Sequence, residues 1–334
     1  MLRIETVTDP AEWDRLVDAG GGHPLQLRGW GEVKATGAWR PLRLRAVAED
    51  GSTVGGAQVL VRRLPAPFRA FAHVPRGPFV GPDGAGTHEE RSAVAQAVVE
   101  HCRREVRGIG VALEPDWDAG TTLDLPGSRQ GRHTILYPST LVLDLTRSEE
   151  DLLAAAGRTT RYDIRKAART GLEVRRVTDE AEVRDVLALY RVSAAHAGFA
   201  LHDDDYYLAI HRELGDASLL VAAFSEGRPC SFVWDVLSGA TAFELYGGVD
   251  ETGRRLRANA PVKWHAVRLA AGAGARRYDM NGLLNDGISE FKKSFAQHTD
   301  ELVGTVEVPF GPLFDVWDRV LPTAKRVVRR LRRG

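Results

Sequence analysis

Lysine is scarce in this chain of 334 residues, which has six lysines against thirty-nine arginines. Cysteine is scarcer still. Cys102 and Cys230 lie too far apart for a paired metal or redox motif, so we expect two buried free thiols. No apolar run reaches the roughly 18 residues that a membrane-spanning helix needs. The start, Leu2-Arg3-Ile4-Glu5, lacks the apolar stretch of a signal peptide, and we expect a cytoplasmic protein.

The chain also lacks net charge, because it contains 45 basic and 45 acidic residues. A uniformly basic field is therefore excluded. This argues against a dedicated nucleic-acid-binding module but leaves room for a local basic patch. The length exceeds that of a usual single hydrophobic core, so we expect two domains.

The predicted elements form two similar α+β units. In each unit two strands joined by a turn precede a helix closed by Gly-x-Gly, and a further strand ends near an acidic residue, Glu114 or Asp279. The first unit comprises a helix from residue 11 and the ranges 40–49, 53–62, 88–107 and 111–115; the second comprises 217–224, 229–237, 240–247, 258–271 and 276–280. Strands and helices that do not alternate strictly favour mixed, partly antiparallel sheets covered by helices.

The remaining elements connect and extend these units. We predict helices at 148–156, 159–169, 179–196, 204–214 and 312–333, strands at 140–145 and 301–308, and an irregular loop at 119–138.

A lysine pair follows the last strand of the second unit. Tyr278-Asp279-Met280-Asn281-Gly282 leads into a short loop, and Phe291-Lys292-Lys293-Ser294-Phe295 comes after it. One interpretation is a solvated basic turn whose two phenylalanines anchor a helix. The other is a functional lysine, because lysine is a compact charge with a tunable pKa, whereas arginine is a fixed planar fork.

Two further segments are strongly basic. Residues 158–169 place four arginines at helical spacing, which fits either a solvated helix face or a ridge that binds phosphates. Residues 325–333 end the chain with six cations around a thin apolar stripe. This end could bind RNA, rest on anionic lipid, or simply suit the helix dipole. The histidines match no metal-ligand spacing, and we predict no metal or cofactor.

Seven segments in order resemble the FemABX family of aminoacyl-tRNA-dependent peptidoglycan bridge transferases. They begin with Gln26 and Trp30-Gly31-Glu32-Val33-Lys34, and continue with Arg76-Gly77-Pro78, 160–171, Leu245-Tyr246-Gly247-Gly248, Pro261-Val262-Lys263-Trp264, 278–282 and 291–295. The resemblance implies two GNAT-like domains. The first would comprise 1–145 and 301–334, and the second, 146–300, would be inserted into it. No heptad-bearing insertion is present, so we expect the form without a coiled-coil arm.

The resemblance implies transfer of an amino acid from a charged tRNA to an amine of a peptidoglycan stem peptide. The acceptor would be UDP-MurNAc-pentapeptide or its lipid-linked form. The aminoacyl ester is already activated, so neither ATP nor a cofactor is implied. We expect a monomer that can contact the inner face of the membrane transiently.

The resemblance also implies roles for individual residues. Lys292, directly after Phe291, matches the lysine that stabilises the oxyanion, and both are assigned to catalysis. Acceptor binding is assigned to Lys34, Trp30, Tyr246 and Tyr207, and tRNA binding to Arg158, Arg161, Arg165, Lys166 and Lys293. The family's acceptor-binding arginine near 198–206 has no match, since Asp203, Asp204 and Asp205 occupy that region. The acidic candidates for a proton acceptor are Asp279 and Asp286.

Three other functions stay open. The acceptor could be a small amine or peptide natural product. The chain could instead be an acyl-CoA-dependent N-acetyltransferase, although Glu105 and Leu269 stand where its pyrophosphate loop wants glutamine or arginine. A non-catalytic tRNA- or membrane-binding module would leave the lysine pair without a role.

Overall fold

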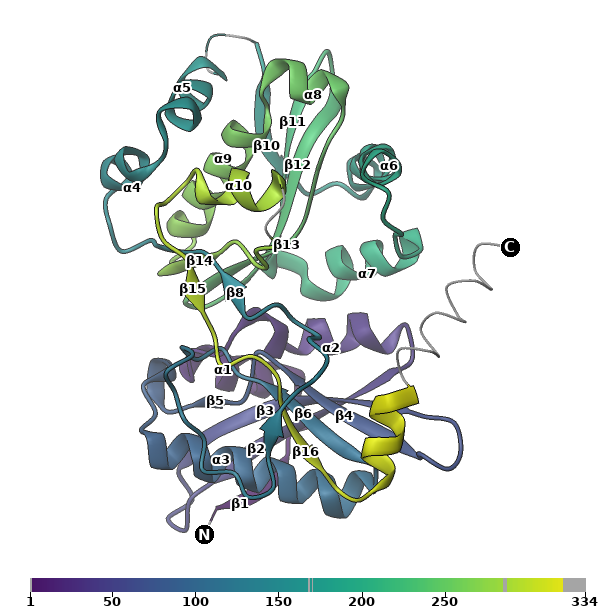
Figure 1. Ribbon diagram of the computed structural model, residues 1–334. Helices are drawn as coiled ribbons and strands as arrows, with labels where there is room; N and C mark the ends of the chain where they lie inside the picture. Colours follow the sequence, from purple (N-terminus) through teal and green to yellow (C-terminus); the bar gives the residue numbers. More distant parts are fainter. Residues whose placement is uncertain (1, 168, 170, 285–286, 321–334) are drawn as a thin grey trace.

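In the computed structural model, which describes residues 2–167, 169, 171–284 and 287–320, the chain forms two large mixed sheets covered by helices (Figure 1). The first sheet has the strand order β1 (Arg3–Thr6), β2 (Trp39–Val47), β3 (Thr53–Arg63), β4 (Ala70–Pro75), β6 (Gly110–Glu114), β16 (Val306–Pro309), β7 (Arg129–Gln130), and β5 (Phe79–Val80) pairs with β3. The second has the order β10 (Glu173–Val177), β11 (Ser218–Ser225), β12 (Arg228–Ser238), β13 (Thr241–Val249), β14 (Arg277–Asp279), β9 (Val142–Asp144).

Helices cover both sheets. Those of the first half are α1 (Pro10–Ala19), α2 (Arg28–Ala35) and α3 (His88–His101), and those of the second are α4 (Glu149–Ala155), α5 (Arg158–Ala167), α6 (Glu180–Ala197), α7 (Asp204–Leu214), α8 (Glu251–Leu256), α9 (Asn259–Gly272) and α10 (Gly287–Lys293). No helix among the described residues is long and apolar enough to cross a membrane.

The layer between the two sheets is one hydrophobic core shared by both halves. Trp13 of α1 and Trp30 and Val33 of α2 belong to the same buried cluster as Tyr190 of α6 and Leu208 of α7. Figure 1 shows α2 and α7 facing each other across this layer. A continuous apolar core resists separation far better than a polar contact does. We therefore treat the two halves as one packed body.

The predicted α+β class with GNAT-like units is confirmed. In each sheet a crossover helix, α3 or α9, connects two parallel strands, β4 with β6 and β13 with β14. Each sheet also contains a strand that is separated in sequence from its neighbour in the sheet. β9, which pairs with β14, comes before the helices of the second half, and β16, which pairs with β6 of the first sheet, comes after the second half. The predicted boundary at 145/146 remains a prediction, although β9 already pairs with β14.

Several elements differ from prediction. The structure adds β1, β4, β5, β10 and α8, and it places β7 within the predicted irregular loop at 119–138. Most of β4 is buried, so the strand lacks the alternation that marks half-buried strands. The strand predicted at 301–308 is split into β15 (Asp300–Glu301) and β16, since Gly304 has φ of 77° and interrupts it. Residues 313–320 are helical as predicted, whereas 321–333 of that helix lie outside the described residues. Cys102 and Cys230 are buried free thiols, as expected.

The two chain crossings between the halves lie side by side. β8 (Ser139–Thr140), on the way out, pairs antiparallel with β15 on the way back. Glu114, at the end of β6, fastens both crossings. Its fully buried carboxylate accepts hydrogen bonds from Leu136 N at 2.9 Å, from Thr305 Oγ1 at 2.7 Å and from the His73 ring at 2.7 Å. Burial would raise the pKa of Glu114, but the hydrogen bonds from His73 and its neighbours hold that pKa below its usual value.

We predict that Glu114→Gln lowers the free energy of unfolding by about 1–3 kcal/mol at pH 7, because buried donors lose a charged acceptor. Since the folded pKa is lowered, this stabilisation is present above the unfolded value near 4.3 and is lost as the pH falls through the folded pKa. Urea unfolding followed by circular dichroism at pH 7 and pH 3 measures both effects. Exposed Glu105→Gln is the control, and equal unfolding midpoints for E114Q and the parent at pH 7 would contradict the prediction.

Candidate active site

A cleft of about 340 Å³ opens where the two parallel strands of the second sheet separate. β13 and β14 pair only as far as Phe243 and Asp279, after which β13 continues and the other strand turns away. A register shift between Trp234 and Asp235 of β12 adds to the distortion. The residues that line the cleft include the aromatics Tyr190, Phe232, Tyr246 and Phe291 and the lysines Lys263 and Lys292.

Lys292 lies in this cleft with its ammonium group already oriented. Its Nζ donates to the backbone oxygens of Asn281 at 3.0 Å and Gly282 at 3.2 Å. The side chain is only about 10% exposed. Asn281 has a left-handed φ of 57°, which turns the chain so that these carbonyls face the lysine. A cation placed in this way can stabilise negative charge that develops in the cleft.

Glu244 lies between Lys292 and a second buried lysine. Its carboxylate forms an ion pair with Lys263, and its Oε1 is 4.0 Å from Lys292 Nζ. Behind it the Tyr278 hydroxyl donates to the buried carboxylate of Asp235. Burial, together with the charge of Glu244, raises the pKa of Asp235 well above its usual value. The two lysines therefore share one nearby carboxylate.

Phe291 forms part of the wall beside the lysines. Its ring packs edge to face on Phe295 at 5.5 Å, and Lys263 Nζ lies 5.6 Å from its centre. The two phenylalanines thus anchor the helix end, as the structural interpretation of the pattern expects, while Lys292 is buried rather than solvated.

The predicted acceptor residues gather at the contact between α2 and α7. Lys34 Nζ donates to the Tyr206 hydroxyl at 3.2 Å and lies 5.0 Å from the centre of the Trp30 ring. Tyr207 is almost fully buried and packs against Tyr246, with 5.3 Å between ring centres. Burial first, and then Tyr206, raise the pKa of Tyr246 well above its usual value. Because Tyr246 also lines the lysine cleft, the two groups of predicted residues form one connected site.

The predicted tRNA ridge lines a surface hollow of about 410 Å³ on α5. Its lining consists of Arg158, Arg161, Tyr162, Arg165, Lys166 and Arg169. Thr160 donates to Ser294 at 2.8 Å, so the start of α5 is tied to the end of the lysine-bearing helix α10. Arg161 also has a structural task, since it donates to the carbonyls of Ala154 and Ala156 at the end of α4. Lys293 is partly exposed and pairs with Glu290 at 3.3 Å.

Of the two acidic candidates, Asp279 does not supply a base in the cleft. Asp279 is fully buried, accepts hydrogen bonds from Thr140 and the amide of Asn281, and does not line the cleft. Burial raises its pKa. Asp286 lies outside the described residues. In the region where the resemblance expects an acceptor-binding arginine, Arg191 of α6 pairs with Asp204. This pair partly neutralises the acidic residues at 203–205.

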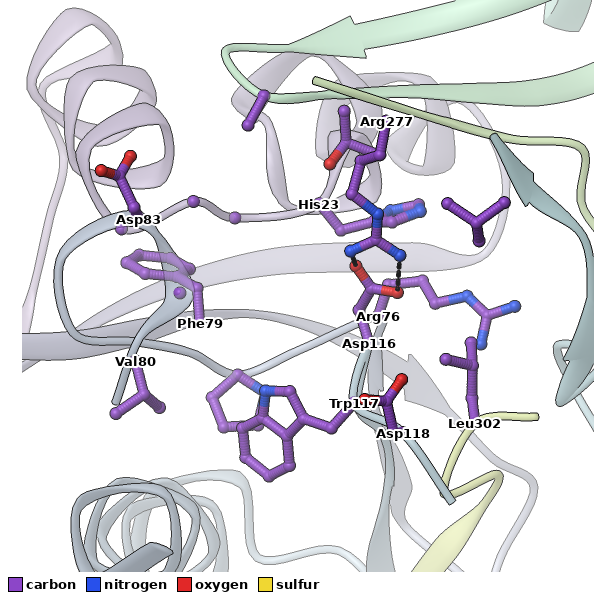
Figure 2. Close-up of a pocket in the computed structure, with 18 of the residues that line it drawn as sticks. His23, Arg76, Phe79, Val80, Asp83, Asp116, Trp117, Asp118, Arg277 and Leu302 are labelled. Atoms are coloured by element: carbon purple, nitrogen blue, oxygen red, sulfur yellow. Dashed lines mark hydrogen bonds and ion pairs between the residues drawn. The ribbon is translucent and has the colours of Figure 1, made fainter. Parts of the chain in front are cut away.

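A second cavity, of about 430 Å³, lies where the parallel strands of the first sheet separate, and sequence reasoning missed it. Figure 2 shows Arg277 of the second sheet reaching into it to meet Asp116, at 2.8 Å. Burial would raise the pKa of Asp116, but Arg277 and neighbouring cations hold it below its usual value. Arg76 donates to the carbonyl of Tyr137 at 2.8 Å. Burial lowers the pKa of His23 to about 3, so this imidazole stays neutral.

Sequence reasoning also missed Glu244, Lys263 and Tyr206 as site residues. Lys263 carried a signal, because it is one of six lysines and lies in a segment that resembles the family. Glu244 and Tyr206 carried none, since both belong to ordinary amphipathic patterns. Only the packing of β13 against α9 and of α7 against α2 brings them to the lysines.

Comparisons with known proteins agree with the fold. Residues 155–293 match the family described as acetyltransferase (GNAT) domain. The chain is 21% identical to lipid II:glycine glycyltransferases of Staphylococcus haemolyticus, over 93% of this chain and 94% of that protein, and of Staphylococcus aureus, over 93% and 95%.

Solved structures share the fold. A crystal structure of FemX superposes with a TM-score of 0.83 at 18% identity and covers 95% of this chain and 100% of that one. The C-terminal domain of a putative lysylphosphatidylglycerol synthetase from Agrobacterium fabrum gives 0.58 at 14% identity, covering 95% and 97%. With the ordered motifs and the two GNAT-like units, these likenesses confirm the expected resemblance to the FemABX family, and the chain is an acyl-transferring enzyme.

Proposed function

We propose that this enzyme moves an amino acid from aminoacyl-tRNA to an amine of a peptidoglycan-precursor stem peptide. The observation that carries the proposal is the buried ammonium of Lys292, held by two backbone carbonyls beside Glu244 in the cleft of the second sheet. The glycyl transfer named for the staphylococcal relatives, with lipid II in that name, supports peptidoglycan bridge formation as the reaction class.

In the proposed step the acceptor amine attacks the carbonyl carbon of the aminoacyl ester. Negative charge forms on the carbonyl oxygen, where Lys292 stabilises it. The bond between the carbonyl carbon and the ribose oxygen then breaks as the amide forms, and the proton lost by the amine ends on that ribose oxygen. Since the ester is already activated, no cofactor takes part. The remaining rate enhancement comes from orientation of the two substrates in one cleft.

The acceptor would enter from the side of Lys34. A lysine beside Tyr206 and Trp30 offers a compact charge for a diphosphate, with aromatic surface next to it. The tyrosine cluster that includes Tyr207 and Tyr246 then leads to the lysine cleft. The donor would approach from the α5 ridge, which the Thr160–Ser294 hydrogen bond ties to α10. We further propose that the enzyme acts as a monomer in the cytoplasm, with transient contact at the inner face of the membrane.

We predict that Lys292→Met lowers kcat by roughly 10²–10³-fold, because the oxyanion loses its preplaced cation. The measurement is transfer of label from radiolabelled glycyl-, alanyl- or seryl-tRNA to UDP-MurNAc-pentapeptide or its lipid-linked form. The matched variant is Lys293→Met, which removes the neighbouring lysine and should raise only the KM for tRNA. An unchanged kcat in K292M refutes the oxyanion role. Transfer from acetyl-CoA but from no aminoacyl-tRNA would support the acetyltransferase instead.

We predict that replacing Arg158 and Arg165 together by glutamine raises the KM for aminoacyl-tRNA and flattens its salt dependence. Each lost phosphate contact reduces the slope of log K against log salt by about 0.7–0.9. Arg161 is left in place because it also holds the end of α4. Exposed Arg184→Gln on α6 controls for the loss of charge, and an unchanged salt slope in the double variant would rule out the ridge as the tRNA site.

A further inference from the structure

Four arginines converge on a broad surface hollow of about 750 Å³ on the first domain. Arg40 comes from β2, Arg63 from the end of β3, Arg69 from the residue before β4, and Arg107 from the turn before β6. All four are exposed. Distant parts of the chain thus bring the same residue type to one place.

These arginines have no carboxylate within ion-pair distance in the part of the chain that the structure describes. Elsewhere on the surface, arginines such as Arg175 and Arg212 pair with glutamates. Because the chain has zero net charge, the excess positive charge at the hollow is matched by excess negative charge on other parts of the protein. Like charges gathered on one surface repel each other, and an external anion would relieve that repulsion.

Apolar side chains lie next to the hollow. The Trp317 ring, in the helix over residues 313–320, packs on Phe68 at 5.0 Å between ring centres, one residue before Arg69. On this helix Leu313, Val316 and Val320 are 39%, 47% and 44% exposed, at a spacing that puts them on one face. Figure 1 shows this helix, in yellow, on the outside of the first domain.

The hollow also adjoins the proposed acceptor site. Gly37, on its rim, donates its amide to the carbonyl of Lys34 at 3.2 Å, and Trp39 lines the hollow two residues later. An acceptor whose diphosphate lies at Lys34 would therefore have its lipid end close to this surface. This link rests on the proposed function, whereas the charge and the apolar face do not.

We propose that these residues form a membrane-docking face, comprising Arg40, Arg63, Arg69, Arg107, Leu313, Val316 and Val320, which binds the surface of an anionic lipid bilayer. Arginines for lipid phosphates beside an exposed apolar helix face are the combination found in interfacial membrane binding. An RNA partner would use the arginines but leave the apolar face in water. A second copy would bring like charges together.

The test is sedimentation of the full-length protein with vesicles. The parent should bind vesicles of phosphatidylglycerol and phosphatidylcholine, bind pure phosphatidylcholine weakly, and lose binding at high salt. Arg63→Glu with Arg69→Glu should weaken binding at least about tenfold, since each basic residue near an anionic surface contributes about 1 kcal/mol. Exposed Arg147→Glu with Arg255→Glu makes the same charge change elsewhere and should bind like the parent. Thermal melting shows whether each variant is folded.

Three results would overturn the proposal. The first is equal vesicle binding by the parent and the Arg63/Arg69 variant, and the second is a variant that loses tRNA binding but keeps vesicle binding. The third is a change of molar mass between parent and variant, which would show that the face joins two copies of the chain. Val316→Ser with Val320→Ser should also weaken vesicle binding while leaving tRNA binding unchanged, and vesicle binding as strong as the parent's would count against the apolar part of the face.

An activity arm separates this proposal from the proposed function. The Arg63/Arg69 variant should keep the parent's kcat/KM with the soluble nucleotide-linked acceptor and lose at least about tenfold with lipid-linked acceptor in anionic vesicles. If the parent transfers to neither acceptor, the proposed function fails while the vesicle result still decides the docking face. Equal loss with both acceptors would mean that the face acts on the active site and not on the membrane.

Discussion

Where two parallel strands separate, backbone carbonyls lose their ladder partners and need other hydrogen-bond donors. The arrangement of both halves depends on which groups fill each separation. In the second sheet the carbonyls of Asn281 and Gly282 accept hydrogen bonds from the ammonium of Lys292. The fold thereby holds a lysine at the open end of the strands. Its charge is further balanced by Glu244, and the cleft around it stays accessible.

The first sheet has the same topology but a different outcome. There the separation after Pro75 and Glu114 is entered by Arg277 from the second sheet, which pairs with Asp116. Glu114 uses its carboxylate to fasten the crossings between the halves. One separation therefore joins the two halves, and the other leaves an accessible cleft, where we propose that the reaction takes place.

The shared helix layer explains why both domains are needed for one site. Lys34 belongs to α2 of the first half, but its hydroxyl partner Tyr206 belongs to α7 of the second. The apolar core around Trp13 and Leu208 holds these helices against each other. A change in the packing of this layer would separate the proposed diphosphate-binding lysine from the tyrosines that lead to Lys292. In the proposed function, acceptor binding is thus a property of the interface.

The sequence by itself determined the α+β class, the repeated unit with carboxylates at Glu114 and Asp279, and most helices and hairpins, because periodicity and turn residues are local signals. Local residue order also marked Lys292, and the ordered motifs indicated the resemblance to the FemABX family. Tertiary structure alone decided that Glu244 and Lys263 pair beside Lys292, that Tyr206 meets Lys34, and that four arginines share one hollow. These contacts join residues far apart in the chain, and no local pattern records which distant elements pack together.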